Sequence, residues 1–196
     1  MLYNNMIKYD YKEKYLNMKK TIFTALAAIT ISICLVSCGN EDAAEGNVIV
    51  TPDDGGYSIE LPEAWEISRT DGLVAAYVPG DATKANVTAY KFETGLNEYI
   101  TSADYWEKYK TQFEDTFTGM TVEKIEETKI SGIDAQYVYY TVNIGLDTFN
   151  CQTVLGVNGT DVYVVTLTQG VQTGENVTTV DYTDTFKEIV NSFKAK

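Results

Sequence analysis

Few residues in this 196-residue chain are suited to covalent or acid–base chemistry. The chain has no histidine, which removes the commonest general base and a common metal ligand. It has three cysteines, Cys34, Cys38 and Cys151. Cys151 lies in an alternating apolar pattern typical of a buried strand, where a free thiol acts as a small hydrophobic group. Because no base is available to activate it, we predict no catalytic role for Cys151.

Two pairs of carboxylates remain as candidates for acid–base chemistry, Glu126–Glu127 and Asp181/Asp184. Glycoside hydrolysis needs two carboxyl groups about 5–10 Å apart across a cleft, which a sequence does not establish. We therefore expect these residues to lie on solvated faces or to cap helices. The sequence also lacks zinc-binding spacings, a phosphate-binding loop and a dinucleotide motif. These observations predict a protein that is not an enzyme and has no metal or cofactor.

The chain is rich in aromatic residues, which make up 12% of its composition. Tyr137, Tyr139 and Tyr140 lie close together in one predicted strand, where Tyr137 and Tyr139 share a face because side chains alternate. If helices cover the opposite face, both rings point outwards with Thr141 and Asn143. Such a strip could stack on sugar rings or contact a partner protein. The alternative is cross-strand packing that stiffens a solvated sheet.

The N-terminal region has the order of a secretory signal. Two lysines precede the uncharged residues 21–35, which lead to Leu35-Val36-Ser37-Cys38. This ending resembles the lipobox of bacterial lipoproteins. In that family the cysteine takes a diacylglyceryl group and the chain is cleaved just before it. The resemblance therefore implies a signal peptide at residues 18–37, lipid attachment at Cys38 and a protein facing the extracytoplasmic side of the cell membrane.

An uncleaved transmembrane helix is the competing interpretation of this region. Uncharged residues run from 21 to 40, close to the ~20 that span a bilayer, although several Thr and Ser residues make the segment only weakly apolar. In both cases the lysines stay cytoplasmic and the C-terminal part is exported. Residues 1–17 show no pattern, and we interpret them as a spurious extension before Met18; a longer n-region is the alternative.

The charge of the chain limits its partners. Its formal net charge is −13. The segment before Cys38 holds five basic and two acidic residues, which leaves 10 basic and 26 acidic residues and a net charge of −16 after cleavage. Such a surface repels the phosphates of nucleic acids and anionic lipid headgroups. We therefore exclude nucleic acids as partners and attribute membrane attachment to the lipid alone.

The remainder of the chain divides into a linker and one domain. Residues 38–56 are acidic and rich in small residues, which predicts a flexible tether, although Val48 to Val50 could add a short strand to the domain. Residues 57–196 are long enough for a single domain with its own core. Alternation and turn residues predict strands over residues 57–62, 65–68, 72–78, 84–92, 121–130, 135–144, 147–157 and 161–168.

Two helices are expected from apolar residues at helical spacing. The first spans about residues 101–118 and the second about residues 181–194. The second would bury one face, made of Tyr182, Phe186, Ile189, Val190 and Phe193. Strands, helix, strands and helix in this order predict an α+β fold, in which both helices cover one face of an antiparallel sheet.

This layout resembles the PsbP-like fold, which is also seen in the Mog family of nuclear-transport factors. The resemblance rests on residues 56–62 followed by Trp65, and on the terminal helix from Phe186 to Phe193. It implies the fold only, because the matching residues are of core and turn type. Bacterial relatives in that family are often small lipoproteins without an assigned activity.

We therefore expect a lipid-anchored extracytoplasmic lipoprotein that acts as a non-catalytic binding or accessory module, with an envelope protein or a glycan as its partner. Two alternatives stay open. One is a carboxylate-dependent hydrolase of cell-envelope polymers. The other is a structural subunit of an envelope complex.

Overall fold

The computed structural model describes residues 46–95, 105–106, 119–172 and 180–196. They belong to one compact unit, residues 33–196. In chain order the elements are β1 (Asn47–Val50), β2 (Tyr57–Pro62), β3 (Glu66–Thr70), β4 (Leu73–Tyr77), β5 (Asn86–Glu93), β6 (Gly119–Ile130), β7 (Ile133–Ile144), β8 (Asp147–Asn158), β9 (Asp161–Gly170), α4 (Thr183–Ser192) and β10 (Lys194–Ala195). Each strand predicted from the sequence is present, with boundaries shifted by at most two residues.

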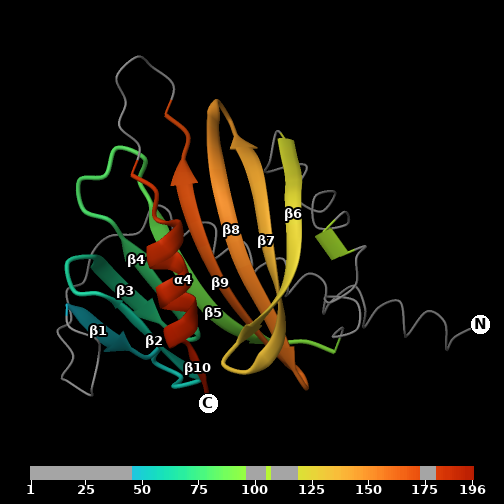
Figure 1. The fold of residues 1–196 in the computed structure, drawn as a ribbon. Coiled ribbons are helices and arrows are strands. Elements are labelled where there is room, and N and C mark those ends of the chain that lie inside the picture. The colour runs from blue at the N-terminus through green and yellow to red at the C-terminus, as the bar shows by residue number, and fades with distance from the viewer. Residues whose placement is uncertain (1–45, 96–104, 107–118, 173–179) are drawn as a thin grey trace, which may run out of the picture. The chain divides into compact units, whose positions relative to one another are not determined.

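The strands form two antiparallel sheets (Figure 1). The large sheet has the order β3-β4-β5-β9-β8-β7-β6, and the small sheet has the order β1-β2-β10. Long hairpins build the centre of the large sheet. The predicted turn at Asn158-Gly159 joins β8 to β9: Asn158 pairs with Asp161, and Gly159 has a φ of 61°, which a residue without a side chain adopts at little cost.

The small sheet explains two differences from the sequence-based expectation. Asn47–Val50, within the predicted tether, form β1 and pair with β2. The strand alternative for Val48 to Val50 therefore holds, because Val50 is buried against the core. Residues 38–45 lie outside the described residues. The last residues of the chain also join this sheet, since Lys194 pairs with Ser58.

The main core lies between one face of the large sheet and a layer made of α4 and the small sheet (Figure 1). Phe186, Ile189 and Val190 are the buried side chains of α4, as the helical spacing predicted. Tyr57 of β2 is buried completely, stacks on Phe193 at a centroid distance of 4.9 Å, and donates a hydrogen bond to the Ala89 carbonyl. Burying each such large apolar side chain stabilises the fold by roughly 1.5–3 kcal/mol.

The expectation that both helices cover the same face is wrong for the part that the structure describes. Phe186 of α4 meets the ring of Tyr137 edge-on at 5.9 Å. Trp106, which is helical, instead meets Tyr140 at 5.8 Å. Tyr137 and Tyr140 point to opposite sides of β7, so the two segments contact opposite faces. Both faces of the large sheet carry apolar side chains that are buried, so each face needs a segment packed against it.

Three sequence expectations concern helices. The helix predicted over residues 101–118 lies outside the described residues apart from Tyr105 and Trp106. The C-terminal helix spans ten residues, Thr183–Ser192, rather than the predicted 181–194. Within the described parts of the chain, no helix has the length and apolar character that crossing a bilayer requires.

Candidate functional site

The two predicted site tyrosines lie beside α4, on the same face of the large sheet. Tyr137 and Tyr139 are both half-buried, and their rings stack at a centroid distance of 4.5 Å with an angle of 10° between the planes. Tyr137 also packs against the main core through Phe186. The sequence analysis placed these tyrosines outwards if helices covered the Val138 face. Instead α4 covers their own face and shields part of Tyr137.

A chain of hydrogen bonds joins the tyrosines to the start of α4. The Tyr137 hydroxyl donates to Oε1 of Gln152 on β8. The Gln152 amide then donates to Oγ1 of Thr183, the first residue of α4, at 2.7 Å. Burial raises the pKa of the Tyr137 hydroxyl, so it stays protonated and keeps donating at neutral pH. These contacts hold β7, β8 and α4 in one arrangement.

Tyr139 is flanked on its other side by charged residues of β6. The Lys124 ammonium lies 5.7 Å from the centroid of the Tyr139 ring, within the range of a cation–π contact. It also forms an ion pair with Glu126 at 2.7 Å. The hydrogen bond from Lys124 lowers the pKa of the Glu126 carboxyl, so this residue is ionised.

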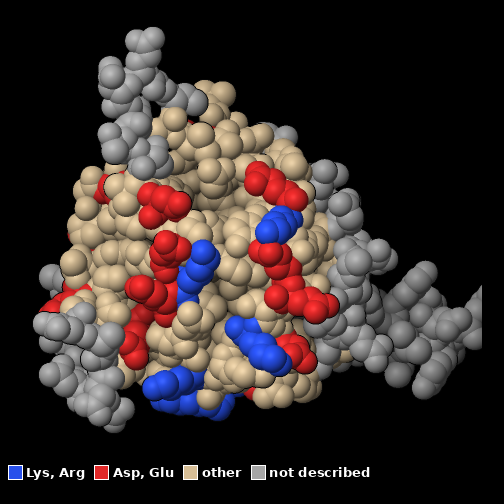
Figure 2. Space-filling view, in the orientation of Figure 1, with Lys and Arg blue, Asp and Glu red and all other residues tan. Residues whose placement is uncertain are grey.

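We define the tyrosine band as Tyr137, Tyr139, Thr141, Asn143 and Gln152. All five share one face, because the first four alternate along β7 and Gln152 pairs with Tyr139 on β8. In Figure 2, an uncharged surface runs between one group of charged residues over α4 and another over β6. Thr141 is half-exposed and Asn143 is exposed, so this surface carries hydroxyl and amide groups at the solvent.

The sequence did not point to the residues that surround the band. Lys124, Gln152 and Thr183 come from β6, β8 and α4, and only the strand register and the helix position bring them to the tyrosines. The predicted grouping of Tyr137 and Tyr139 with Thr141 and Asn143 followed from alternation alone.

The predicted carboxylate pairs do not form a facing pair of acids. Glu126 and Glu127 follow each other on β6, so they point to opposite sides of the sheet. Asp181 accepts a hydrogen bond from the backbone N–H of Thr183 at 2.9 Å, and Asp184 forms an ion pair with Lys187 at 3.1 Å. The pKa of Glu126 and that of Asp181 are lowered by hydrogen bonds, whereas a catalytic acid needs a raised pKa.

Cys151 is a buried free thiol, as its strand pattern predicted. It lies opposite Tyr140 on the face that Trp106 contacts. Burial raises the pKa of the thiol to about 12, and hydrogen bonds with Thr168 and Tyr140 oppose this only in part. The thiol is therefore protonated and unreactive at neutral pH. Among the described residues, no group of three or more Asp, Glu or Cys residues could hold a metal ion.

Comparisons by sequence find no relative: no family model matches the chain, and no curated protein matches it. Solved structures do match. The solution structure of cyanobacterial PsbP (CyanoP) from Synechocystis matches with a TM-score of 0.54 and 18% identity, over 83% of this chain and 99% of that one. The Ran-binding protein Mog1p of Saccharomyces cerevisiae matches with a TM-score of 0.51 and 12% identity, over 76% of this chain and 95% of that one.

The chain has a PsbP/Mog-like fold. At these identities the similarity concerns the fold alone. A Bacteroides thetaiotaomicron structure matches with a TM-score of 0.46 and 14% identity, over 77% of this chain, and this chain covers only 48% of that larger one. The matches to CyanoP and Mog1p confirm, at the level of the fold, the resemblance inferred from residues 56–62 and the terminal helix.

Proposed function

We propose that this chain is a lipid-anchored extracytoplasmic lipoprotein, acylated at Cys38, that acts as a non-catalytic binding or accessory module through the tyrosine band. One observation carries the proposal: hydroxyl, amide and aromatic side chains, half-buried except for the exposed Asn143, share one face of the large sheet beside α4. The lipobox resemblance at residues 35–38 supports the anchor. The PsbP/Mog-like fold supports an accessory role, since one protein with this fold is described as Ran-binding.

The geometry of the band favours hydrogen bonding over ring stacking. One face of the Tyr137 ring contacts Tyr139, and an edge-on contact joins it to Phe186. Tyr139 has Tyr137 on one side and the Lys124 ammonium near its ring. A sugar ring therefore has little free aromatic face to stack on. The accessible groups suit a partner that presents hydrogen-bonding groups, which an envelope protein segment or the hydroxyls of a glycan both supply.

The charged border of the band allows a test that leaves the net charge unchanged. Lys124 and Glu126 form an exposed ion pair, so the double variant K124E/E126K reverses the pair without removing it. We expect this reversal to reduce recovery of a specific protein or glycan partner from solubilised membranes at least ~10-fold, since like charges placed opposite one another at an interface cost several kcal/mol. Recovery is measured by quantitative mass spectrometry of the captured material.

The matched control is the double variant K129D/D134K. Lys129 and Asp134 form a second exposed ion pair of the same hairpin, on the opposite face of the sheet. This variant should capture the partner as the wild type does. If both variants lose partner recovery equally, or if only the control loses it, the tyrosine band is excluded as the binding surface.

A structural subunit of an envelope complex is the second candidate. It is favoured by exposed apolar side chains near one end of the large sheet. Leu146 is fully exposed in the turn between β7 and β8, and Val171, partly exposed, donates its backbone N–H to Thr148 just beyond that turn. Exposed apolar side chains mark interaction sites where they form a contiguous patch. Substituting Leu146 and Val171 by Ser should then shrink the complex in size-exclusion chromatography, while K124E/E126K should leave its size unchanged.

A further inference from the structure

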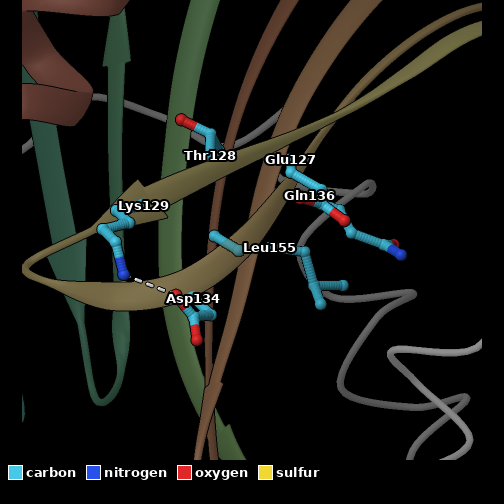
Figure 3. A pocket seen from close by; sticks show the side chains of 7 residues that line it. Glu127, Thr128, Lys129, Asp134, Gln136 and Leu155 are labelled. Carbon is cyan, nitrogen blue, oxygen red and sulfur yellow. Dashed lines mark hydrogen bonds and ion pairs between the residues drawn. The ribbon is translucent and has the colours of Figure 1, made fainter.

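A separate hollow lies at the β6–β7 hairpin (Figure 3). Three of the residues that line it, Glu127, Gln136 and Leu155, point to the face of the large sheet opposite the tyrosine band. The volume of the hollow is about 560 Å³. This volume falls within the range of about 300–1,000 Å³ that small-molecule sites occupy. The described residues that line it are Glu127, Thr128, Lys129, Asp134, Ala135, Gln136 and Leu155.

Three side chains form a row across the strands at this hollow. Gln136 of β7 lies opposite Glu127 of β6 and opposite Leu155 of β8. Cross-strand partners point to the same side, and Figure 3 shows the three projecting together. Leu155 is buried and provides an apolar base. The indole N–H of Trp106 donates to Gln136 Oε1 at 3.1 Å, which orients the amide.

The charges of the described residues around the hollow do not balance. Lys129 and Asp134 form an ion pair at 2.5 Å and neutralise each other (Figure 3). Glu127 is exposed and has no ion-pair partner within the part of the chain that the structure describes. Among the described lining residues one negative charge is therefore in excess, on a chain whose net charge is −13. Both the local and the overall field attract cations.

We propose that this hollow binds a small organic cation, an amine or guanidine with a short neutral body. Its charged group would pair with the Glu127 carboxylate, and its neutral part would lie against Leu155, beside Gln136. The proposal goes beyond the accessory role above: the site lies on the opposite face from the tyrosine band and does not depend on the lipid at Cys38.

Trp106 provides a direct reporter for the test. The chain has two tryptophans, so W65F leaves Trp106, whose indole contacts Gln136, as the single source of tryptophan fluorescence. The probes are 5-aminopentan-1-ol and 1,5-pentanediol, which match in size and differ in charge. We expect a saturable change in Trp106 fluorescence with the amine and at least ~10-fold weaker binding of the diol, a difference of about 1.4 kcal/mol.

The variant E127Q, in the same W65F background, should weaken binding of the amine by a similar factor of about ten. The exposed Glu123 lies on the same strand outside the lining of the hollow, so E123Q changes the charge equally and should bind the amine as the parent does. Circular dichroism verifies that each variant is folded. Equal binding of amine and diol, unchanged binding by E127Q, or the lack of a saturable signal would overturn the proposal.

A further probe distinguishes the sources of such a cation. N-acetyl-lysine N-methylamide carries the same ammonium on a peptide-like body. Tighter binding of 5-aminopentan-1-ol supports a free small amine, and tighter binding of the lysine derivative supports a lysine side chain presented by another protein. Loss of partner capture in K124E/E126K is a separate outcome, so the two sites can fail independently.

Discussion

Tyr137 and Tyr139 show at the level of single residues how similar positions acquire different roles. They are two residues apart on one strand, and their rings stack on each other. Tyr137 also contacts Phe186 and donates to Gln152, which ties it to the main core. Tyr139 contacts mainly Tyr137 and the charged residues of β6. We infer that Tyr137 stabilises the fold and that Tyr139 belongs to the accessible part of the tyrosine band.

This difference predicts unequal effects of the same substitution. Y137S should lower the free energy of unfolding by about 2–3 kcal/mol, because it removes packing against the core and leaves Gln152 without its donor. Y139S should lower it by less than about 1 kcal/mol while reducing partner capture. Urea denaturation at constant m-value measures both. Equal destabilisation by the two variants would contradict the distinction.

Cys151 makes a residue-level prediction about pH. Its ordinary pKa is 9.0, and in the folded protein burial raises it to about 12. The unfolded thiol therefore loses its proton above pH 9 while the folded thiol keeps it. The stability that this group contributes is complete below pH 9 and is lost as the pH rises towards 12, by at most about 1.4 kcal/mol per pH unit.

Comparison with C151A isolates this effect from the tyrosines that titrate in the same range. The difference in unfolding free energy between wild type and C151A should be constant from pH 6 to pH 8 and should shrink above pH 9. The largest possible slope of this decrease is about 1.4 kcal/mol per pH unit, because only one group titrates. Urea denaturation across this range measures it. A difference that stays constant up to pH 11 would show that the thiol is not shielded from solvent.

At the level of elements, α4 decides where the tyrosine band lies. Its apolar side packs on the large sheet and on β2, and its first residue bonds to Gln152. Asp181 satisfies the backbone N–H of Thr183 at the start of the helix. This contact supports the end of the helix that borders the band.

Substituting Asp181 therefore tests how much this hydrogen bond stabilises α4. Hydrogen bonds from Thr183 lower the pKa of the Asp181 carboxyl below its ordinary value of 3.8. The stabilisation is therefore present above pH 3.8 and is lost as the pH falls through the lower pKa of the folded state. D181A should cost about 0.5–1 kcal/mol at pH 7, and the cost should decrease on acidification. E188Q, an exposed change on the same helix, should cost less at pH 7 in the same urea denaturation.

At the scale of the whole molecule, charge and the predicted anchor act together. The proposed cleavage before Cys38 would leave a net charge of −16, which would repel anionic lipid surfaces, so membrane attachment would depend on the acyl chains alone. A single acyl chain holds a protein only marginally, at ~0.8 kcal/mol per buried CH₂, whereas a diacylglyceryl group provides two chains.

The anchor predicts a clear labelling result in the full-length protein. Wild-type protein grown with labelled palmitate should incorporate the label and fractionate with membranes, and C38S should incorporate none. C151S is the matched control, because it removes a cysteine outside the lipobox and should keep the label. Intact-mass analysis locates the modification. An unlabelled wild type, or label retained in C38S, would exclude lipidation at Cys38.

The sequence alone determined strands β2 to β9 and the helix α4, because alternation, helical spacing and turn residues depend on close neighbours in the chain. It located β7 and the shared face of Tyr137 and Tyr139, the buried side of α4 and the buried thiol of Cys151. The tertiary structure decided which face of the sheet α4 covers, and it brought Lys124, Gln152 and Glu127 to their sites. Those placements depend on strand register and on packing between segments far apart in the chain, which local patterns do not encode.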